Sequence, residues 1–229
     1  MFRLPVVLLC VLLALFVAAC GEDDEGGGGS GGEPAAEATP EPAAAGCEAA
    51  EAPEPKGEGD LPKPKERLEA GKTYVATVTT NCGAFEITLD AEQAPRTGGS
   101  FKSLADQGFY DGTTFHRIVA GFVAQGGDPQ GTGSGGPGYS VVEAPPEGLV
   151  YEKGVVAMAK TGMEEAGTSG SQFFVVTAED AQLPADYALL GRVTGGQEVV
   201  DKIAVAETDP STEMPIEPIV MQSVEVAEQ

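Results

Sequence analysis

The chain has 229 residues, and its 36 Asp and Glu residues outnumber 13 Lys and Arg residues, giving a formal net charge of −23. This acidic balance argues against a nucleic-acid-binding protein, because binding to a phosphate backbone needs a basic surface. Hydrophobic residues make up 41% of the chain. That fraction is enough for a core in part of the chain, and the length suits one domain with additional segments.

The first element in chain order is an apolar run over residues 4–19, which follows a single basic residue, Arg3. The run is shorter than the roughly 20 residues of a membrane-spanning helix, and it has the basic start and small-residue end of a secretory signal. Its last four residues, VAAC at Val17–Cys20, resemble the lipobox of bacterial lipoproteins. The resemblance implies a signal peptide at 1–19, lipidation of Cys20 and anchoring at the extracytoplasmic face of the cell membrane. An ordinary secreted protein and an uncleaved anchor are the alternatives.

Residues 20–71 are predicted to form a lipidated, disordered linker, because Gly, Pro, Ala and acidic residues dominate and leave little to bury. Cys47 lies in this stretch, and the next cysteine is Cys82. In an exported chain these two thiols are expected to form a disulfide. Two unrelated thiols are the alternative.

The folded domain is predicted to span residues 72–229. Residues 73–90, TYVATVTTNCGAFEITLD, have the alternation of half-buried strands on either side of an NCG turn. A helix is predicted to open at Ala94-Pro95, and a second to cover 197–206. Residues 174–180, 188–194 and 220–226 are further strand candidates. Many short strands with only two helices indicate a mainly β fold, a closed barrel with helical caps.

The segment FHRIVAGFVAQGGDPQG, residues 115–131, contains the only histidine, His116, next to Arg117, and has no cysteine, lysine or paired carboxylates. His116 has no second histidine or cysteine at metal-ligand spacing, so no metal site is predicted, and we interpret this histidine as structural. The segment GTGSGG at 131–136 formally matches a dinucleotide-binding pattern. Pro137 and Gly138 follow it instead of a helix, which argues against that interpretation.

Four segments in order resemble the cyclophilin-type peptidyl-prolyl isomerases: FHRIVAGFVAQGGD (115–128), GVVAMAKTG (154–162), GSQFFVVT (170–177) and LLGRV (189–193). The similarity covers roughly residues 72–226. It implies a closed eight-stranded antiparallel β-barrel capped by two α-helices, and an enzyme that interconverts the cis and trans forms of X-Pro bonds.

The resemblance also implies roles for individual residues. Arg117 matches the catalytic arginine, Phe122 an aromatic wall of the proline pocket, and Gln125 the glutamine that binds the substrate backbone. The other positions that match substrate-binding residues are Val123, Gly131, Ala159, Lys160, Gln172, Phe174, Leu183 and Tyr187.

Four positions depart from the family pattern. Val123 stands where the family usually has methionine, and Lys160 where it usually has asparagine. Gln182 replaces the usual tryptophan, and Tyr187 the usual histidine. These changes concern substrate preference more than the reaction.

The reaction explains why the segment needs no nucleophile, since rotation about an X-Pro bond breaks no covalent bond. The expected function is the folding of exported proteins at the outer face of the membrane, without a cofactor. Unfolded exported proteins and proline-containing peptides are the expected partners of a monomeric enzyme. The alternative is a non-catalytic proline-peptide-binding or chaperone module of the cell envelope. Retention of Arg117 with Gln125 favours the enzyme, because docking needs the pocket but not the cation.

Overall fold

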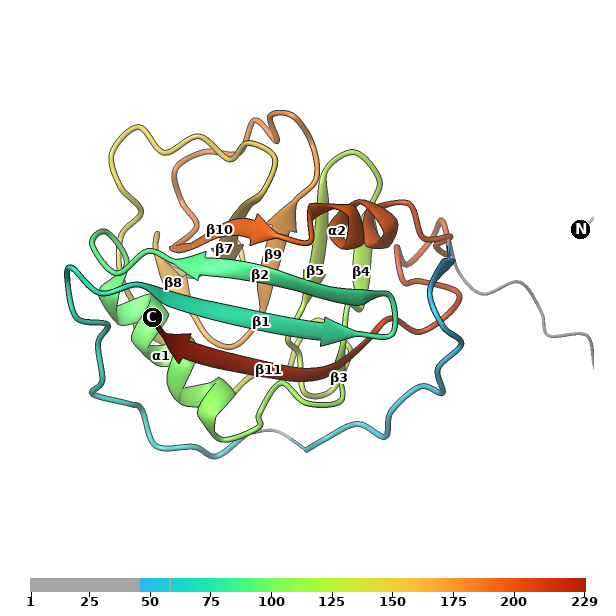
Figure 1. Cartoon of the computed structure of the whole chain (residues 1–229), viewed down its shortest axis with the longest axis horizontal. Helices are drawn as coiled ribbons and strands as arrows, with labels where there is room; N and C mark the ends of the chain where they lie inside the picture. The colour runs from blue at the N-terminus through green and yellow to red at the C-terminus, as the bar shows by residue number, and fades with distance from the viewer. Residues whose placement is uncertain (1–45, 58) are drawn as a thin grey trace, which may run out of the picture. The chain divides into compact units, whose positions relative to one another are not determined.

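The computed structural model describes residues 46–57 and 59–229, which form eleven strands and two helices (Figure 1). In chain order these are β1 (Tyr74–Thr80), β2 (Gly83–Leu89), α1 (Pro95–Asp106), β3 (Thr113–Thr114), β4 (Arg117–Val119), β5 (Val123–Gly126), β6 (Val141–Val142), β7 (Val155–Met158), β8 (Thr168–Ser169), β9 (Phe173–Val176), β10 (Leu189–Gly195), α2 (Gln197–Ala204) and β11 (Val220–Glu228).

The predicted hairpin and both predicted helices are present. β1 and β2 pair antiparallel from Tyr74 opposite Leu89 to Thr80 opposite Gly83. Phe85, Ile87 and Leu89 face the core, as their alternation with more polar residues predicts. The mainly β fold with two helices is therefore confirmed.

The principal sheet has nine strands in the order β3-β11-β1-β2-β10-β7-β9-β5-β4, and β6 and β8 form a separate pair. The expectation was eight strands in a closed barrel. The sheet curls (Figure 1), and its two end strands, β3 and β4, lie close together in sequence. A single bridge between Thr114 and Asp128 joins β3 to the residues after β5.

The main core fills the inside of the curled sheet. Phe173 is its central aromatic, with ring centroids 5.7 Å from Phe101 and 6.0 Å from both Tyr110 and Phe115. The two helices close the core, since Phe101 of α1 and Ile203 of α2 are almost completely buried.

The first turn of α1 receives its cap from a distant loop. The helix has no side-chain cap of its own at Ala94. Instead, the Glu143 carboxylate accepts hydrogen bonds from the backbone N–H groups of Arg96 and Thr97 at 3.0 and 2.8 Å. A carboxylate at this end also interacts favourably with the helix dipole. This contact fixes α1 relative to the loop that contains β6.

Residues 46–57 and 59–71, which we call the strap, lie along the outside of the domain (Figure 1). Residues 20–71 were expected to form a disordered linker, but backbone hydrogen bonds join the strap to the folded domain. Lys56 N–H donates to Pro129, Gly59 to Gly136 and Leu61 to Pro137. The composition suggested nothing to bury, but the strap needs few apolar side chains because its backbone supplies the contacts.

Two buried side chains fasten the ends of the strap. Cys47 forms a disulfide with Cys82 in the β1–β2 turn. Leu68 is 5% exposed and lies over Gly98 of α1, where a Cβ atom would collide with its side chain. Gly98 therefore has a packing reason to be glycine inside a helix.

The predicted signal peptide at 1–19 and the predicted lipidation site, Cys20, lie outside the described residues. Within the part of the chain that the structure describes, no helix has the length and apolar character needed to cross a membrane.

Candidate active site

The strand register places three of the predicted site residues in one row. Arg117 of β4 stands opposite Gln125 of β5, and Gln125 stands opposite Phe174 of β9. Directly opposite residues in antiparallel strands point to the same face of a sheet, with Cβ atoms about 4.5–5.5 Å apart. The arginine, the glutamine and the aromatic ring therefore project from the same face.

This face is opposite to the main core. Ile118, next to Arg117, is 2% exposed and belongs to the core. The pair Phe173-Phe174 is divided in the same way, with Phe173 in the core and Phe174 in a second apolar cluster. The alternation of a strand explains why two adjacent phenylalanines serve different purposes.

The second apolar cluster gathers most of the predicted proline pocket. Val123 and Phe174 are buried in it. The rings of Phe174 and Tyr187 meet edge to face with centroids 5.4 Å apart. The predicted residues that pack against the cluster while remaining partly exposed are Phe122, Ala159, Leu183 and Tyr187. The result is an apolar surface, open to solvent, beside Arg117 and Gln125.

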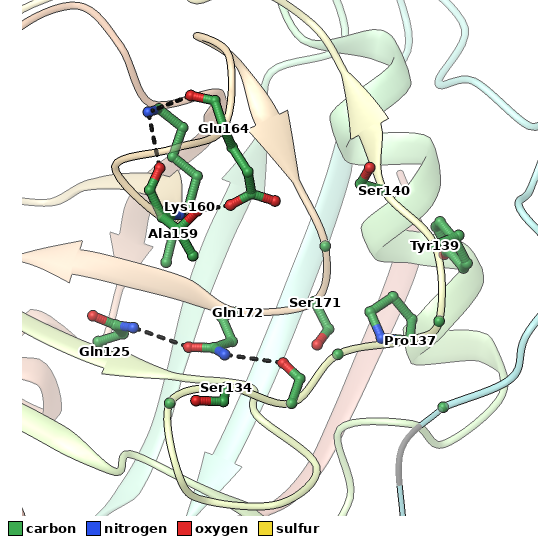
Figure 2. Close-up of a pocket in the computed structure, with 17 residues that line it drawn as sticks. Gln125, Ser134, Pro137, Tyr139, Ser140, Ala159, Lys160, Glu164, Ser171 and Gln172 are labelled. Atoms are coloured by element: carbon green, nitrogen blue, oxygen red, sulfur yellow. Dashed lines mark hydrogen bonds between the residues drawn. The ribbon is translucent and has the colours of Figure 1, made fainter.

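A chain of side-chain amides borders this surface. Gln125 Nε2 donates to Gln172 Oε1 at 3.0 Å, and Gln172 Nε2 donates to the Gly135 carbonyl at 2.9 Å. Figure 2 shows this chain crossing from β5 to the loop after it. Both glutamines also line a groove of about 620 Å³. The amides therefore lie between the apolar surface and the groove.

Asp128 shapes the loop that contains Gly135. Its carboxylate accepts hydrogen bonds from the backbone N–H groups of Gln130, Thr132, Gly133 and Gly135. Burial alone would raise the pKa of Asp128, but the N–H groups of Gln130, Gly135 and Gly133 outweigh burial and hold the pKa below its ordinary value.

Gly131, the predicted rim glycine, lies in the same loop with φ +69°, a left-handed conformation that favours glycine. It does not line the groove, whereas Gly133 and Gly135 do. The glycine in direct contact with the amide chain is therefore Gly135, which the sequence comparison did not single out.

Lys160 contributes its backbone and not its charge to the exposed surface. Its side chain is only 4% exposed, and its Nζ lies 2.6 Å from Asp186 Oδ2. The same ammonium donates to the carbonyls of Thr161 and Glu164 (Figure 2). Within the described residues, the N–H and C=O groups of Lys160 make no hydrogen bond, so both are free for an extended peptide.

Tyr151 is a structural residue of the site that sequence reasoning missed. Its hydroxyl donates to the Tyr187 carbonyl at 2.6 Å and accepts from the Tyr187 N–H at 3.1 Å. It thereby fixes the backbone of the residue that replaces the usual histidine, and its ring meets the Tyr187 ring edge to face with centroids 6.0 Å apart. Gln182, at the position of the usual tryptophan, is exposed in a loop with φ +51° and does not belong to the apolar cluster.

Glu213 also escaped prediction. Its Oε2 lies 2.6 Å from Arg117 Nε, although 96 residues separate the two in the chain. No sequence pattern marks it, because it comes from the irregular segment between α2 and β11. Among residues 46–57 and 59–229, no group of three or more His, Cys, Asp and Glu side chains is placed to hold a metal ion.

His116 is buried beside the site, with 5% of its surface exposed. Burial lowers its pKa, against smaller opposing effects of Asp128 and the Thr114 backbone. Thr114 faces the ring at a geometry short of a regular hydrogen bond, and neither ring nitrogen has a hydrogen-bond partner among the described residues. The ring is therefore neutral at pH 7, which agrees with a structural role and not with a role in proton transfer.

Comparison with known proteins agrees with this arrangement. The sequence model of the family "Cyclophilin type peptidyl-prolyl cis-trans isomerase/CLD" matches residues 75–226. Peptidyl-prolyl cis-trans isomerase B of Streptomyces anulatus is 41% identical over 169 residues, which cover 66% of this chain and 95% of that protein. The protein of the same name from Bacillus subtilis is 46% identical over 114 residues, 49% of this chain and 78% of the relative.

Among solved structures, a cyclophilin-type isomerase of Cryptosporidium parvum superimposes with a TM-score of 0.64 at 30% identity, covering 69% of this chain and 99% of that one. A second structure of that protein, determined in the presence of the dipeptide Ala-Pro, gives a TM-score of 0.63. Together with the site geometry, these matches show that the chain belongs to the cyclophilin family of peptidyl-prolyl cis-trans isomerases.

Proposed function

We propose that Arg117 is the catalytic residue of this isomerase and that the proline ring of the substrate lies on the surface formed by Phe122, Phe174 and Leu183. The observation that carries the proposal is the row Arg117–Gln125–Phe174 across three neighbouring strands. It sets a cation, an amide and an apolar wall side by side on one face of the sheet.

The chemistry follows from the barrier to rotation. Resonance in the planar amide opposes rotation by about 18–20 kcal/mol. In the twisted transition state the proline nitrogen becomes pyramidal and has a free lone pair, which a guanidinium N–H can donate to. Because the planar ground state offers no such lone pair, the interaction stabilises the transition state selectively.

The required acceleration is modest. Uncatalysed isomerisation takes about 10–100 s. A turnover of about 10 per second would need roughly three decades of acceleration, or about 4 kcal/mol. One charge-assisted hydrogen bond at a site partly shielded from water, together with the apolar wall, can supply an effect of this size.

Gln125 is proposed to hold the substrate backbone while the other side of the bond turns. Its amide is fixed because one N–H is used by Gln172, which Gly135 fixes in turn. The remaining N–H and the carbonyl of Gln125 are left for the peptide. Lys160, with free backbone N–H and C=O groups, supports pairing with an extended substrate on the other side of the groove.

We also propose that the enzyme acts on exported proteins from the extracytoplasmic face of the membrane, anchored by lipid on Cys20. The support is the short apolar run that ends in VAAC and the disulfide between Cys47 and Cys82, a bond typical of oxidising compartments. The enzyme is proposed to act as a monomer, because every residue of the row comes from one chain.

Two measurements test these proposals. Exchange spectroscopy on an Ala-Pro peptide should show accelerated interconversion with the wild-type enzyme and a markedly weaker effect with Phe122→Ala. Equal acceleration by both would contradict the assignment of the proline surface. For the anchor, the intact mass of detergent-extracted protein should correspond to a chain that begins at Cys20 with acyl groups, and an unmodified Cys20 thiol would contradict lipidation.

A further inference from the structure

The loop between α2 and β11, residues 207–217, lies against the end of the sheet next to Arg117. The sheet order ends at β4, so one edge of this strand has no strand neighbour. Glu213 covers part of that edge, since its carbonyl accepts a hydrogen bond of 2.8 Å from the Ile118 N–H. The backbone of Glu213 is thus hydrogen-bonded to Ile118, the residue that follows Arg117.

The side chain of Glu213 makes a second contact on the same edge. Its Oε2 lies 2.6 Å from Arg117 Nε, and the two side chains are 43% and 36% exposed, respectively. A pair this exposed contributes little to the stability of the fold, on the order of 0–1 kcal/mol. Its main effect is therefore on where the guanidinium points.

The backbone of Glu213 is in an uncommon conformation. Its φ is +60°, and only one other non-glycine residue among 46–57 and 59–229, Gln182, has a positive φ. Such a conformation is unfavourable for a residue with a Cβ atom and persists only where the surroundings impose it. Here the loop imposes it, because the Glu213 N–H donates to the Asp209 carbonyl at 2.8 Å.

The side chain of Asp209 supports the turn that leads to Glu213. Its carboxylate accepts hydrogen bonds from the N–H groups of Ser211 and Thr212 and from the Ser211 hydroxyl. These bonds lower the pKa of Asp209, the Ser211 side-chain bond most strongly, so the carboxylate is ionised at neutral pH. The backbone of Glu213 is therefore held on both sides: its N–H is bonded to Asp209, and its carbonyl to Ile118.

The choice of nitrogen on Arg117 matters for catalysis. A guanidinium has five N–H donors, one on Nε and two on each Nη. Glu213 uses the Nε donor, so the four donors on the terminal nitrogens are available to a substrate. Arginine loses about 2 kcal/mol of rotamer freedom when it is fixed, and a carboxylate on Nε fixes it before the substrate arrives.

We infer that Glu213 is a positioning residue for the isomerase reaction: it orients the guanidinium of Arg117 through Nε so that the terminal N–H groups face the proline nitrogen. The inference rests on the proposed catalytic role of Arg117. Since the orientation is needed for the transition state, removal of the carboxylate should lower kcat and leave KM almost unchanged.

Two variants of Glu213 test this. Glu213→Gln keeps the shape and removes the charge, and we expect kcat on an Ala-Pro peptide to fall about 3- to 10-fold with KM within twofold of wild type. Glu213→Gly suits the left-handed backbone, so we expect a similar fall in kcat with no fall in the melting temperature. Glu207→Gln, which removes an exposed charge in the same loop, serves as the control and should retain wild-type kcat. A kcat for Glu213→Gln equal to or above that of wild type would overturn the inference.

A double-mutant cycle separates this inference from the function on which it rests. In an Arg117→Ala background the Glu213→Gln change should alter the residual rate by less than about 1.5-fold, because there is no guanidinium to orient. The same 3- to 10-fold loss in both backgrounds would show that Glu213 acts through the loop alone and would overturn the inference. High activity of Arg117→Ala itself would instead contradict the proposed role of Arg117.

Discussion

Gln125 Nε2 donates a hydrogen bond of 3.0 Å to Gln172 Oε1, and so connects two segments that lie 47 residues apart in the chain. The bond uses one N–H of the Gln125 amide and leaves the other N–H and the carbonyl available to a substrate. It also makes the orientation of Gln125 depend on Gln172, which is in turn held by the Gly135 carbonyl.

Replacing Gln172 with alanine should therefore reduce kcat/KM about fivefold without unfolding the protein. The expected size follows from the roughly 1 kcal/mol that a typical hydrogen bond contributes. Peptide kinetics measure the effect. Ser134→Ala is the matched control, because Ser134 lines the same groove and its hydroxyl holds neither glutamine. Unchanged kinetics in Gln172→Ala would show that Gln125 does not need this support.

Asp128→Asn should destabilise the fold by about 2 kcal/mol or more at pH 7, because four N–H groups then lose a charged acceptor. The native pKa of Asp128 lies below its ordinary value of 3.8. The carboxylate therefore stabilises the fold above that value, and the stabilisation is lost as the pH falls through the native pKa. In urea unfolding, the difference in the free energy of unfolding between wild type and variant should become smaller under strongly acidic conditions. A difference that does not change with pH would contradict this account.

Because His116 is buried, we predict that the folded protein loses stability in mild acid. Burial lowers the pKa of the native ring below its ordinary value of 6.5. As the pH falls below about 6.5, the unfolded chain therefore takes up a proton before the native protein does, and the free energy of unfolding decreases until the native pKa is reached. His116→Gln should remove this part of the pH dependence between pH 7.5 and 5. An identical pH dependence in both proteins would show that the histidine is not held neutral.

Removal of the Cys47–Cys82 disulfide, by replacing both residues with serine, should lower the free energy of unfolding by about 2–4 kcal/mol. It should also loosen the strap, because the disulfide fastens its start. Hydrogen exchange is expected to quicken at the Lys56 and Leu61 amides, which donate to the 129–137 loop, and to stay slow at Ala76 in the centre of β1. Equal protection of the strap in wild type and variant would show that backbone contacts alone retain it.

The parts of the fold that the sequence predicted are those with a regular pattern. The hairpin of β1 and β2 was visible in the alternation around Phe85. The helix α1 was visible in the proline of its first turn, and α2 in the i,i+4 pair of Glu198 and Lys202. The three strands of two residues each, β3, β6 and β8, are too short to have a pattern. That is one reason why the strand count differs from the expected eight.

The site was predictable in the same limited sense. Residues inside the matching segments, such as Arg117, Gln125 and Phe174, do lie together. Glu213 was not predictable, because an irregular loop brings it to Arg117 and its side chain could equally belong to a solvated surface. The disulfide of the strap was expected, but its course along the domain was missed, because the backbone hydrogen bonds that hold it do not depend on the composition that suggested a linker.

The central claim is that the guanidinium of Arg117 accelerates rotation about the X-Pro bond. The most direct measurement is kcat/KM on an Ala-Pro peptide for wild type, Arg117→Ala and Arg117→Lys, with circular dichroism to verify the fold. We predict a loss of about 100-fold or more in Arg117→Ala. We also predict poor rescue by lysine, which retains the charge without the planar set of donors. A kcat/KM for Arg117→Ala within about threefold of wild type would contradict the claim.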